Sequence, residues 1–181
     1  TRWAVCVAAE ADCELRAVTV VNRSRRPREV ELTSFAEVCL NHRRADHAHP
    51  AFAKLFLETE FDATSGALLV RRRPRGADEK PVWAIHFSAP YIPEPGAMEY
   101  ETDRVRFLGR GRTPANPAAV GSGARLSQTT GPVLDPVFSL RRRVRLDLGA
   151  SARVVFATGA GDTWSAAIAI AEEFRDLEGM D

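Results

Sequence analysis

One stretch decides the fold class: Val30-Glu31-Leu32-Thr33-Ser34-Phe35-Ala36-Glu37-Val38-Cys39-Leu40. Its even positions are apolar apart from Ser34, and polar residues such as Glu31 and Glu37 lie at odd positions. A period of two places successive side chains on opposite faces of a pleated strand. The stretch therefore predicts one long strand with a buried face and a solvated face.

The same alternation recurs on both sides of this stretch, in runs separated by turn residues. The runs that read as strands are Arg2–Ala8, Glu14–Asn22, Leu55–Phe61, Ala67–Arg71, Pro81–Ser88, Phe138–Leu146 and Ala152–Thr158. Many short alternating runs without intervening helical patterns are typical of antiparallel sheets. The chain is therefore expected to be mainly β, an antiparallel β-sandwich.

The period changes near the C-terminus. Asp162 and Thr163 can cap a helix, and apolar residues then follow helical spacing as far as Phe174. The pattern predicts one C-terminal α-helix over Thr163–Leu177. Residues 1–161 then form the sandwich domain, and residues 162–181 form a terminal helical segment.

Composition limits the classes of function. The net charge of +1 gives no strong field for a nucleic acid or a membrane surface, and no apolar run approaches the roughly 20 residues of a membrane span. A soluble domain is expected. The three cysteines form no motif, which favours a reducing compartment, and Cys6 and Cys39 are expected to be mostly buried. Trp3 and Trp83 are expected to fill the core.

A basic stripe alternates along the run near residue 140. Arg141, Arg143 and Arg145 share one face, which we interpret as a solvated face paired with the acids of the long strand, Glu29, Glu31 and Glu37. Arg142 interrupts the apolar face and therefore has to reach an edge or find a partner.

The histidine-rich segment Asn41–Phe52 is predicted to be a polar loop. His47 and His49 would share a strand face and could chelate a metal, but Pro50 interrupts the strand and the next acid, Glu58, is nine residues after His49. A metal site is therefore not expected. Glu58 and Glu60 could lie about 7 Å apart, within the range of an inverting glycosidase pair, but strand faces are often acidic simply because they are solvated, so a catalytic pair is not expected.

The segment Gly109–Thr130 is predicted to be a long loop. Its Gly-x-Gly has neither the third glycine nor the strand–turn–helix context of a dinucleotide site. Arg110 and Arg112 on this loop could reach an anion or a sugar hydroxyl. The residues provide no convincing catalytic set and imply no cofactor.

Three stretches together resemble a known family. They are Glu29–Glu37 continuing into Asp46–Phe56, then Tyr100–Arg110, then Thr130–Pro136. They resemble the β-sandwich domain of glycoside hydrolase family 94, formerly glycosyltransferase family 36, and are most similar to that of the cyclic β-1,2-glucan synthases.

The resemblance implies a galactose-mutarotase-like supersandwich that precedes an (α/α)6 barrel, which carries the catalytic acid and binds phosphate. The terminal segment 162–181 would begin the connection to that barrel. Catalysis by the parent, a glycosyltransferase or glycoside phosphorylase, would occur in the barrel, so no catalytic residue is transferred to this chain. The resemblance implies the cytoplasmic side of an inner-membrane parent protein, and it leaves a homodimer open.

In the family, the loop after the long strand can lie near the sugar acceptor. The residues that match this loop are the candidates for sugar contact or domain docking, together with the two arginines of the glycine-rich loop: Arg43, Arg44, Asp46, His47, His49, Arg110 and Arg112. Three hypotheses follow. The first is a non-catalytic domain that supports the barrel and contacts β-glucan. The others are a self-contained carbohydrate-binding module and a metal-dependent enzyme that uses His47 and His49.

Overall fold

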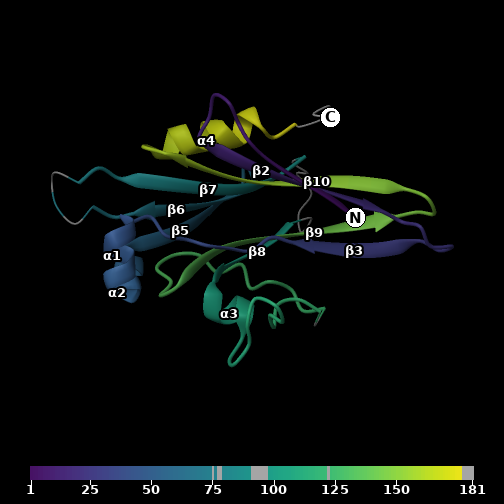
Figure 1. Ribbon diagram of the computed structural model, residues 1–181, viewed down its shortest axis with the longest axis horizontal. Helices are drawn as coiled ribbons and strands as arrows, with labels where there is room; N and C mark the ends of the chain where they lie inside the picture. The colour runs from purple at the N-terminus through teal and green to yellow at the C-terminus, as the bar shows by residue number, and fades with distance from the viewer. Residues whose placement is uncertain (75, 77–78, 91–97, 122, 177–181) are drawn as a thin grey trace.

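Two antiparallel sheets stack face to face in the computed structural model, which describes residues 1–74, 76, 79–90, 98–121 and 123–176 (Figure 1). The large sheet has the strand order β1-β2-β10-β7-β6-β5. Its strands are β1 (Arg2–Val7), β2 (Cys13–Val21), β5 (Leu57–Asp62), β6 (Ala67–Arg72), β7 (Val82–Ala89) and β10 (Ser151–Gly161). The prediction of an antiparallel β-sandwich is confirmed.

The small sheet is built on β9 (Pro136–Leu146). One edge of β9 pairs with β3 (Arg28–Thr33) and then β4 (Ala36–Glu37), and the other edge pairs with β8 (Met98–Asp103). The described residues also form four helices: α1 (Arg43–Ala48), α2 (Pro50–Lys54), α3 (Arg104–Leu108) and α4 (Trp164–Glu173). The sequence predicted α4 but not the three shorter helices.

The long strand predicted over residues 30–40 is broken after Thr33. Ser34 keeps one backbone bond to β9, from its N–H to the Leu140 carbonyl at 2.9 Å, but its hydroxyl accepts the Leu140 N–H at 2.9 Å. Phe35 then stacks on Phe107 of α3, with ring centroids 4.7 Å apart. The prediction of one continuous strand is wrong because Ser34 substitutes a side-chain bond for a ladder bond and Phe35 packs outside the sandwich.

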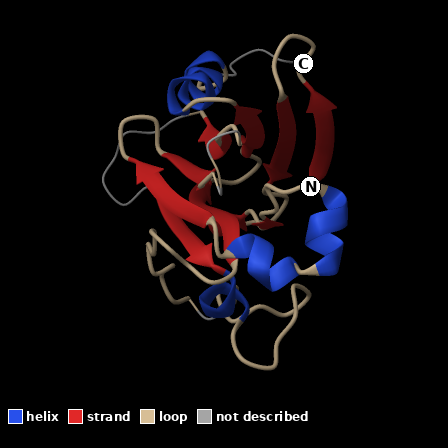
Figure 2. Ribbon diagram, turned by 90° about the vertical axis from the view of Figure 1, so that its left-hand side faces the viewer, coloured by secondary structure: helices blue, strands red, loops and turns tan. Residues whose placement is uncertain are grey.

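Apolar side chains fill both faces of the large sheet. One cluster lies between the sheets and includes Leu57, Leu68, Val70, Phe138, Leu140 and Phe156. The other lies under α4, which covers the outer face of the sheet with Ala167, Ile168, Ile170 and Ala171. Figure 2 shows α4 at one end of the stack and the shorter helices toward the other.

The start of α4 agrees with the sequence pattern. Thr163 is the N-cap, and its hydroxyl accepts the Ala166 N–H at 3.1 Å. The helix ends at Glu173, before the predicted end at Leu177, which lies outside the described residues.

Three of the predictions about burial are wrong. Trp3 is 66 % exposed rather than buried in the core, and Cys6 and Cys39 are exposed, whereas Cys13 is buried. The reason for Trp3 and Cys6 is that β1 is an edge strand, paired with β2, and all six of its residues are exposed. Trp83 is half-buried against the cluster under α4, as expected.

The arginines of β9 have different environments. Arg143 pairs with Glu31 across the strands at 2.9 Å, as predicted. Arg141 is only 1 % exposed, so the prediction of a solvated face is wrong for this residue. Its guanidinium lies 3.5 Å from a Glu99 carboxylate oxygen and donates to the backbone carbonyls of Ala119 and Ala124. Arg141 therefore anchors the long loop to the sheet.

Two other charged residues meet partners that the pattern did not name. Glu37 pairs with Arg104 of α3 at 2.8 Å rather than with the arginines of β9. Arg142 donates to the Ser88 hydroxyl at 3.1 Å and to the Pro90 carbonyl at 3.0 Å. The expectation that Arg142 needs a partner is confirmed.

Candidate functional site

The predicted polar loop Asn41–Phe52 is helical. His42 is the N-cap of α1, with its Nδ1 accepting the Arg44 N–H at 3.4 Å, and Pro50 begins α2, where a missing N–H costs nothing. The prediction of a loop is wrong because these two capping signals allow two short helices. Four of the candidate side chains here are exposed to solvent: Arg43, Arg44, His47 and His49. The fifth, Asp46, is half-buried.

A chain of ion pairs holds α2 in place, and α1 is joined directly to α2 through His49. Lys54 at the end of α2 lies 2.5 Å from Asp135, which is 3.7 Å from Arg104, which in turn contacts Glu37 of β4. Phe52 and Phe56 add an edge-to-face contact with centroids 5.3 Å apart. The exposed residues of α1 are therefore presented from an attached element and not from a free loop.

The other two candidates lie on a different element. Arg110 and Arg112 are exposed at the turn after α3, where Gly109 has a φ of 80°. A Cβ at Gly109 would lie 2.7 Å from the Cβ of Ala118, so this turn requires glycine. Among the hydrogen bonds and ion pairs of the described residues, none joins Arg110 or Arg112 to α1. The structure separates the predicted site residues into two groups.

The metal and glycosidase alternatives lose their geometric premises. His47 lies on α1 and His49 between the two helices, so they do not share a strand face. Glu58 pairs with Arg71 at 2.5 Å and with Arg73 at 3.1 Å, and Glu60 accepts the indole N–H of Trp164. No group of three potential metal-ligating side chains occurs in the part of the chain that the structure describes.

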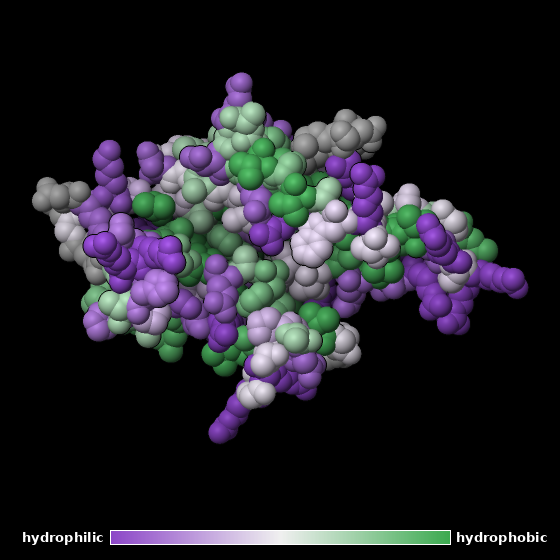
Figure 3. Space-filling model, in the orientation of Figure 1, coloured by the Kyte–Doolittle hydropathy of each residue, from purple (hydrophilic) through white to green (hydrophobic). Residues whose placement is uncertain are grey.

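A cleft that the sequence did not reveal lies between the sheets on the side of β1. Its volume is about 530 Å³. We call it the interlayer cleft and define it by the residues that line it: Trp3, Glu14, Arg16, Val18, Leu32, Thr33, Ser34, Phe35, Ala36, His86, Phe156 and Thr158. Figure 3 shows the molecule hollowed between its two layers on the face that carries α1 at one end.

The floor of the cleft is a hydrogen-bonded polar chain centred on a buried histidine. His86, 3 % exposed, lies with Nε2 2.8 Å from the Ser34 hydroxyl and Nδ1 2.8 Å from the Thr158 hydroxyl. Its ring stacks with Phe138 and with Phe156, at centroid distances of 5.3 and 6.3 Å. Burial lowers the pKa of His86 from 6.5 to about 4, so the imidazole is neutral and donates through one nitrogen and accepts through the other.

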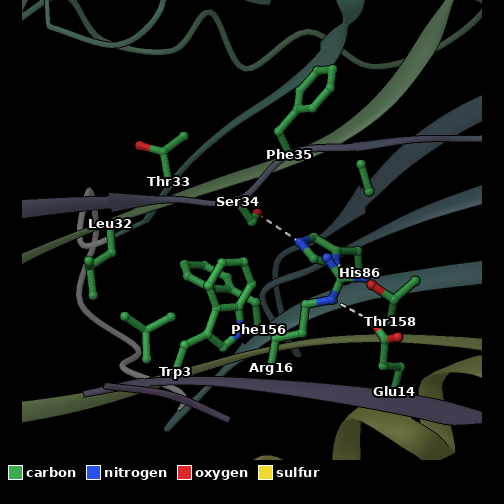
Figure 4. Close-up of a pocket in the computed structure, with 12 residues that line it drawn as sticks. Trp3, Glu14, Arg16, Leu32, Thr33, Ser34, Phe35, His86, Phe156 and Thr158 are labelled. Atoms are coloured by element: carbon green, nitrogen blue, oxygen red, sulfur yellow. Dashed lines mark hydrogen bonds and ion pairs between the residues drawn. The ribbon is translucent and has the colours of Figure 1, made fainter. Parts of the chain in front are cut away.

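The wall of the cleft comes from β1 and β2. Trp3 is opposite Val18 and Val5 is opposite Arg16, so their side chains share the inner face of the large sheet. Figure 4 shows Trp3, Arg16 and Glu14 projecting from this sheet toward Ser34 and Leu32 on the other side. The Arg16 Nε donates to Glu14 at 2.5 Å, and both side chains remain partly exposed.

One sequence signal could have located this cleft. Cys13, Leu15 and Ala17 alternate with Glu14 and Arg16 in β2, so one face of the strand carries a charged pair. Charged residues on the strand face that is directed toward the opposite sheet indicate that the opposite sheet does not cover that face. The pattern does not specify which face this is.

Comparison with known proteins places this arrangement in a family. Residues 1–177 match the model of the glycosyl hydrolase 94 supersandwich domain, and the chain belongs to that family. A cyclic β-(1,2)-glucan synthase, NdvB of Rhizobium meliloti (strain 1021), is 41 % identical over 152 residues. That alignment covers 84 % of this chain but 5 % of NdvB, so the chain spans only a small part of its relative's length. The resemblance identified from the three stretches of sequence is confirmed.

Among the described residues, no helix combines the length and the apolar character needed to cross a bilayer.

Proposed function

We propose that this chain is a non-catalytic supersandwich domain of a cyclic β-1,2-glucan synthase-like protein, where it supports a catalytic (α/α)6 barrel and contacts glucan through α1. The parent would act on the cytoplasmic side of the inner membrane as a glycosyltransferase or glycoside phosphorylase. The similarity to NdvB over 84 % of the chain supports the assignment to a glucan synthase.

One observation carries the glucan contact. The polar side chains of α1 are exposed, yet α2, which follows α1 directly, is fixed by the ion pair of Lys54 with Asp135. Binding to a surface that is already ordered avoids the entropy of immobilising a loop. Guanidinium and imidazole groups can donate hydrogen bonds to sugar hydroxyls, and the Asp46 carboxylate can accept hydrogen bonds from sugar hydroxyls.

The acidic residues on β5 support a non-catalytic role. Glycoside chemistry needs one carboxyl group to deliver a proton and another to act as base or nucleophile. Glu58 is engaged with two arginines and Glu60 with the indole of Trp164. These contacts make both residues structural groups of the sheet.

Titration with linear β-1,2-gluco-oligosaccharides, followed by backbone NMR shifts, tests the proposal. We expect saturable shifts of α1 amides, and the double variant Arg43→Gln/Arg44→Gln should weaken binding about tenfold, the effect of losing two charge-assisted hydrogen bonds. The double variant Arg23→Gln/Arg25→Gln, in the exposed loop after β2, is the matched control and should bind as wild type. Absence of any shift at millimolar sugar would contradict the glucan contact.

The supporting role needs a second experiment on the parent protein. Lys54→Met weakens the attachment of α2 without touching the exposed α1 side chains. If the domain positions α1 for the barrel, the variant should make less glucan although its thermal midpoint falls by only about 2–4 °C. Normal synthesis by a variant with demonstrably mobile α1–α2 helices would argue against this role.

A further inference from the structure

We propose that the interlayer cleft is a second subsite, which binds a short segment of neutral β-linked glucan with Trp3 as its stacking platform. The inference rests on the glucan-contacting function proposed above, but it concerns different elements. The α1 surface consists of exposed polar groups on short helices, whereas the cleft is a cavity between sheets.

The cleft has the size and composition of a small-ligand site. Binding pockets enclose roughly 300–1,000 Å³ and combine mostly apolar walls with a few placed polar groups. The volume of about 530 Å³ lies in this range. Leu32, Val18 and Phe156 provide apolar surface, while Arg16 and Glu14 provide donors and acceptors.

A pyranose matches this arrangement because it is itself two-sided. Its ring faces expose C–H groups, which pack against the electron-rich face of an indole, and its hydroxyl edges need hydrogen bonds. Trp3 exposes 66 % of its surface on the same sheet face as Arg16 and Glu14. A glucose unit lying on Trp3 would direct hydroxyls toward this charged pair.

The charge of the wall favours a neutral ligand. Arg16 and Glu14 neutralise each other at 2.5 Å, so the wall offers hydrogen bonds of both kinds without a net charge. An anion would meet Glu14 and a cation would meet Arg16. A chain of sugar hydroxyls, each both donor and acceptor, meets neither penalty.

The floor of the cleft is already organised. His86, Ser34 and Thr158 satisfy one another, and the Ser34 hydroxyl also accepts the Leu140 N–H. The ring also stacks with two phenylalanines, Phe138 and Phe156. A ligand therefore meets a rigid base, and the cleft does not need to rearrange around it.

The indole N–H signals of the three tryptophans provide the test in the intact chain. Titration with a linear β-1,2-glucotriose should shift the Trp3 signal, assigned with Trp3→Phe, and leave Trp164 unmoved. Arg16→Gln should weaken the binding reported by the Trp3 indole signal about tenfold. Trp3→Ala lacks that signal, so its binding is followed through the neighbouring backbone amides and should also be weakened about tenfold. Trp164→Ala and Arg2→Gln are exposed controls outside the cleft and should leave it unchanged.

The outcomes separate this inference from the proposed function. If glucan binds but the Trp3 indole N–H signal does not shift, and Trp3→Ala binds glucan as tightly as wild type, the proposed cleft subsite is overturned. The proposed glucan contact of α1 is then unaffected. If no glucan binds anywhere, the proposed function itself fails. If the Trp3 signal moves with protein concentration and not with sugar, a second copy of the chain covers this face, and the inference is overturned.

Discussion

The hydroxyl of Ser34 lies 2.8 Å from Nε2 of His86 and so joins the break in the small sheet to the centre of the large sheet. Ser34 is where the β3–β4 edge leaves the regular ladder, and His86 is the buried polar residue of β7. Thr158 of β10 binds the other imidazole nitrogen at 2.8 Å. One side chain therefore fixes the spacing of the layers at the base of the interlayer cleft.

Replacement of this histidine should destabilise the domain. His86→Leu removes the imidazole that the half-buried hydroxyls of Ser34 and Thr158 share, at a cost of about 1–3 kcal/mol. Urea unfolding would measure the difference. His47→Leu, at an exposed position, is the matched control and should keep the wild-type midpoint. Equal midpoints for His86→Leu and wild type would show that the hydroxyls find other partners.

The same histidine predicts a pH dependence of stability. The folded-state pKa is lowered to about 4, below the 6.5 of the unfolded chain, so the unfolded state binds more protons between these values. Stability from this group is complete above pH 6.5 and is lost as the pH falls toward 4. The advantage of wild type over His86→Leu should shrink by about 2 kcal/mol between pH 7 and pH 5. A constant advantage over that range would contradict the lowered pKa.

Arg141 should control the order of the loop after α3. Arg141→Met removes a buried cation beside Glu99 and the donors to Ala119 and Ala124, which should cost about 3 kcal/mol. Trypsin should then cut faster at Arg110, Arg112 and Arg125. Arg145→Met, at an exposed position on the same strand, is the control. Unchanged cleavage rates in Arg141→Met would mean that the loop is held by other contacts.

The Lys54–Asp135 pair should couple α2 to the loop before β9. Both side chains are partly exposed, so a double-mutant cycle of Lys54→Met and Asp135→Asn should give a coupling of only about 0.5–1 kcal/mol. Local effects should be larger than global ones, with faster hydrogen exchange over residues 43–54 in either variant. Exchange that rises equally across the whole domain would point to global destabilisation instead.

The three cysteines should differ in reactivity. Burial raises the pKa of Cys13 to about 11, and burial also raises the pKa of Cys39, although its side chain is more accessible. The thiolate is the reactive form, so alkylation at pH 8 should label Cys6 first, Cys39 more slowly and Cys13 only after unfolding. Mass spectrometry of timed samples would give the order. Rapid labelling of Cys13 in the folded protein would show that β2 is not packed as described.

Much of the fold was predictable because alternation is a local property. The runs near residues 14–22, 81–88 and 138–146 became β2, β7 and β9 with nearly the predicted limits. The cap at Thr163 and the helical spacing after it located α4. Each of these features depends on neighbours within a few residues, and the sequence alone contains that information.

The candidate site was less predictable because its features depend on distant parts of the chain. The break at Ser34 depends on Leu140 and Phe107, and the helical form of Asn41–Phe52 is supported by Asp135. The arginine stripe looked uniform, yet Arg141 is buried by the loop that it binds, whereas Arg143 and Arg145 are exposed. Arginines that look equivalent in the alternating pattern therefore differ in burial, because contacts with residues far away in the sequence differ.

The sequence by itself therefore determined the strands, the terminal helix and, through three motifs, the family. Only the tertiary structure decided which faces are covered. Alternation assigns Trp3 and Arg16 each to one face of its own strand, but only the pairing of β1 with β2 places both side chains on the same cleft. Covering is a relation between two layers, so the interlayer cleft exists only once both sheets have been placed.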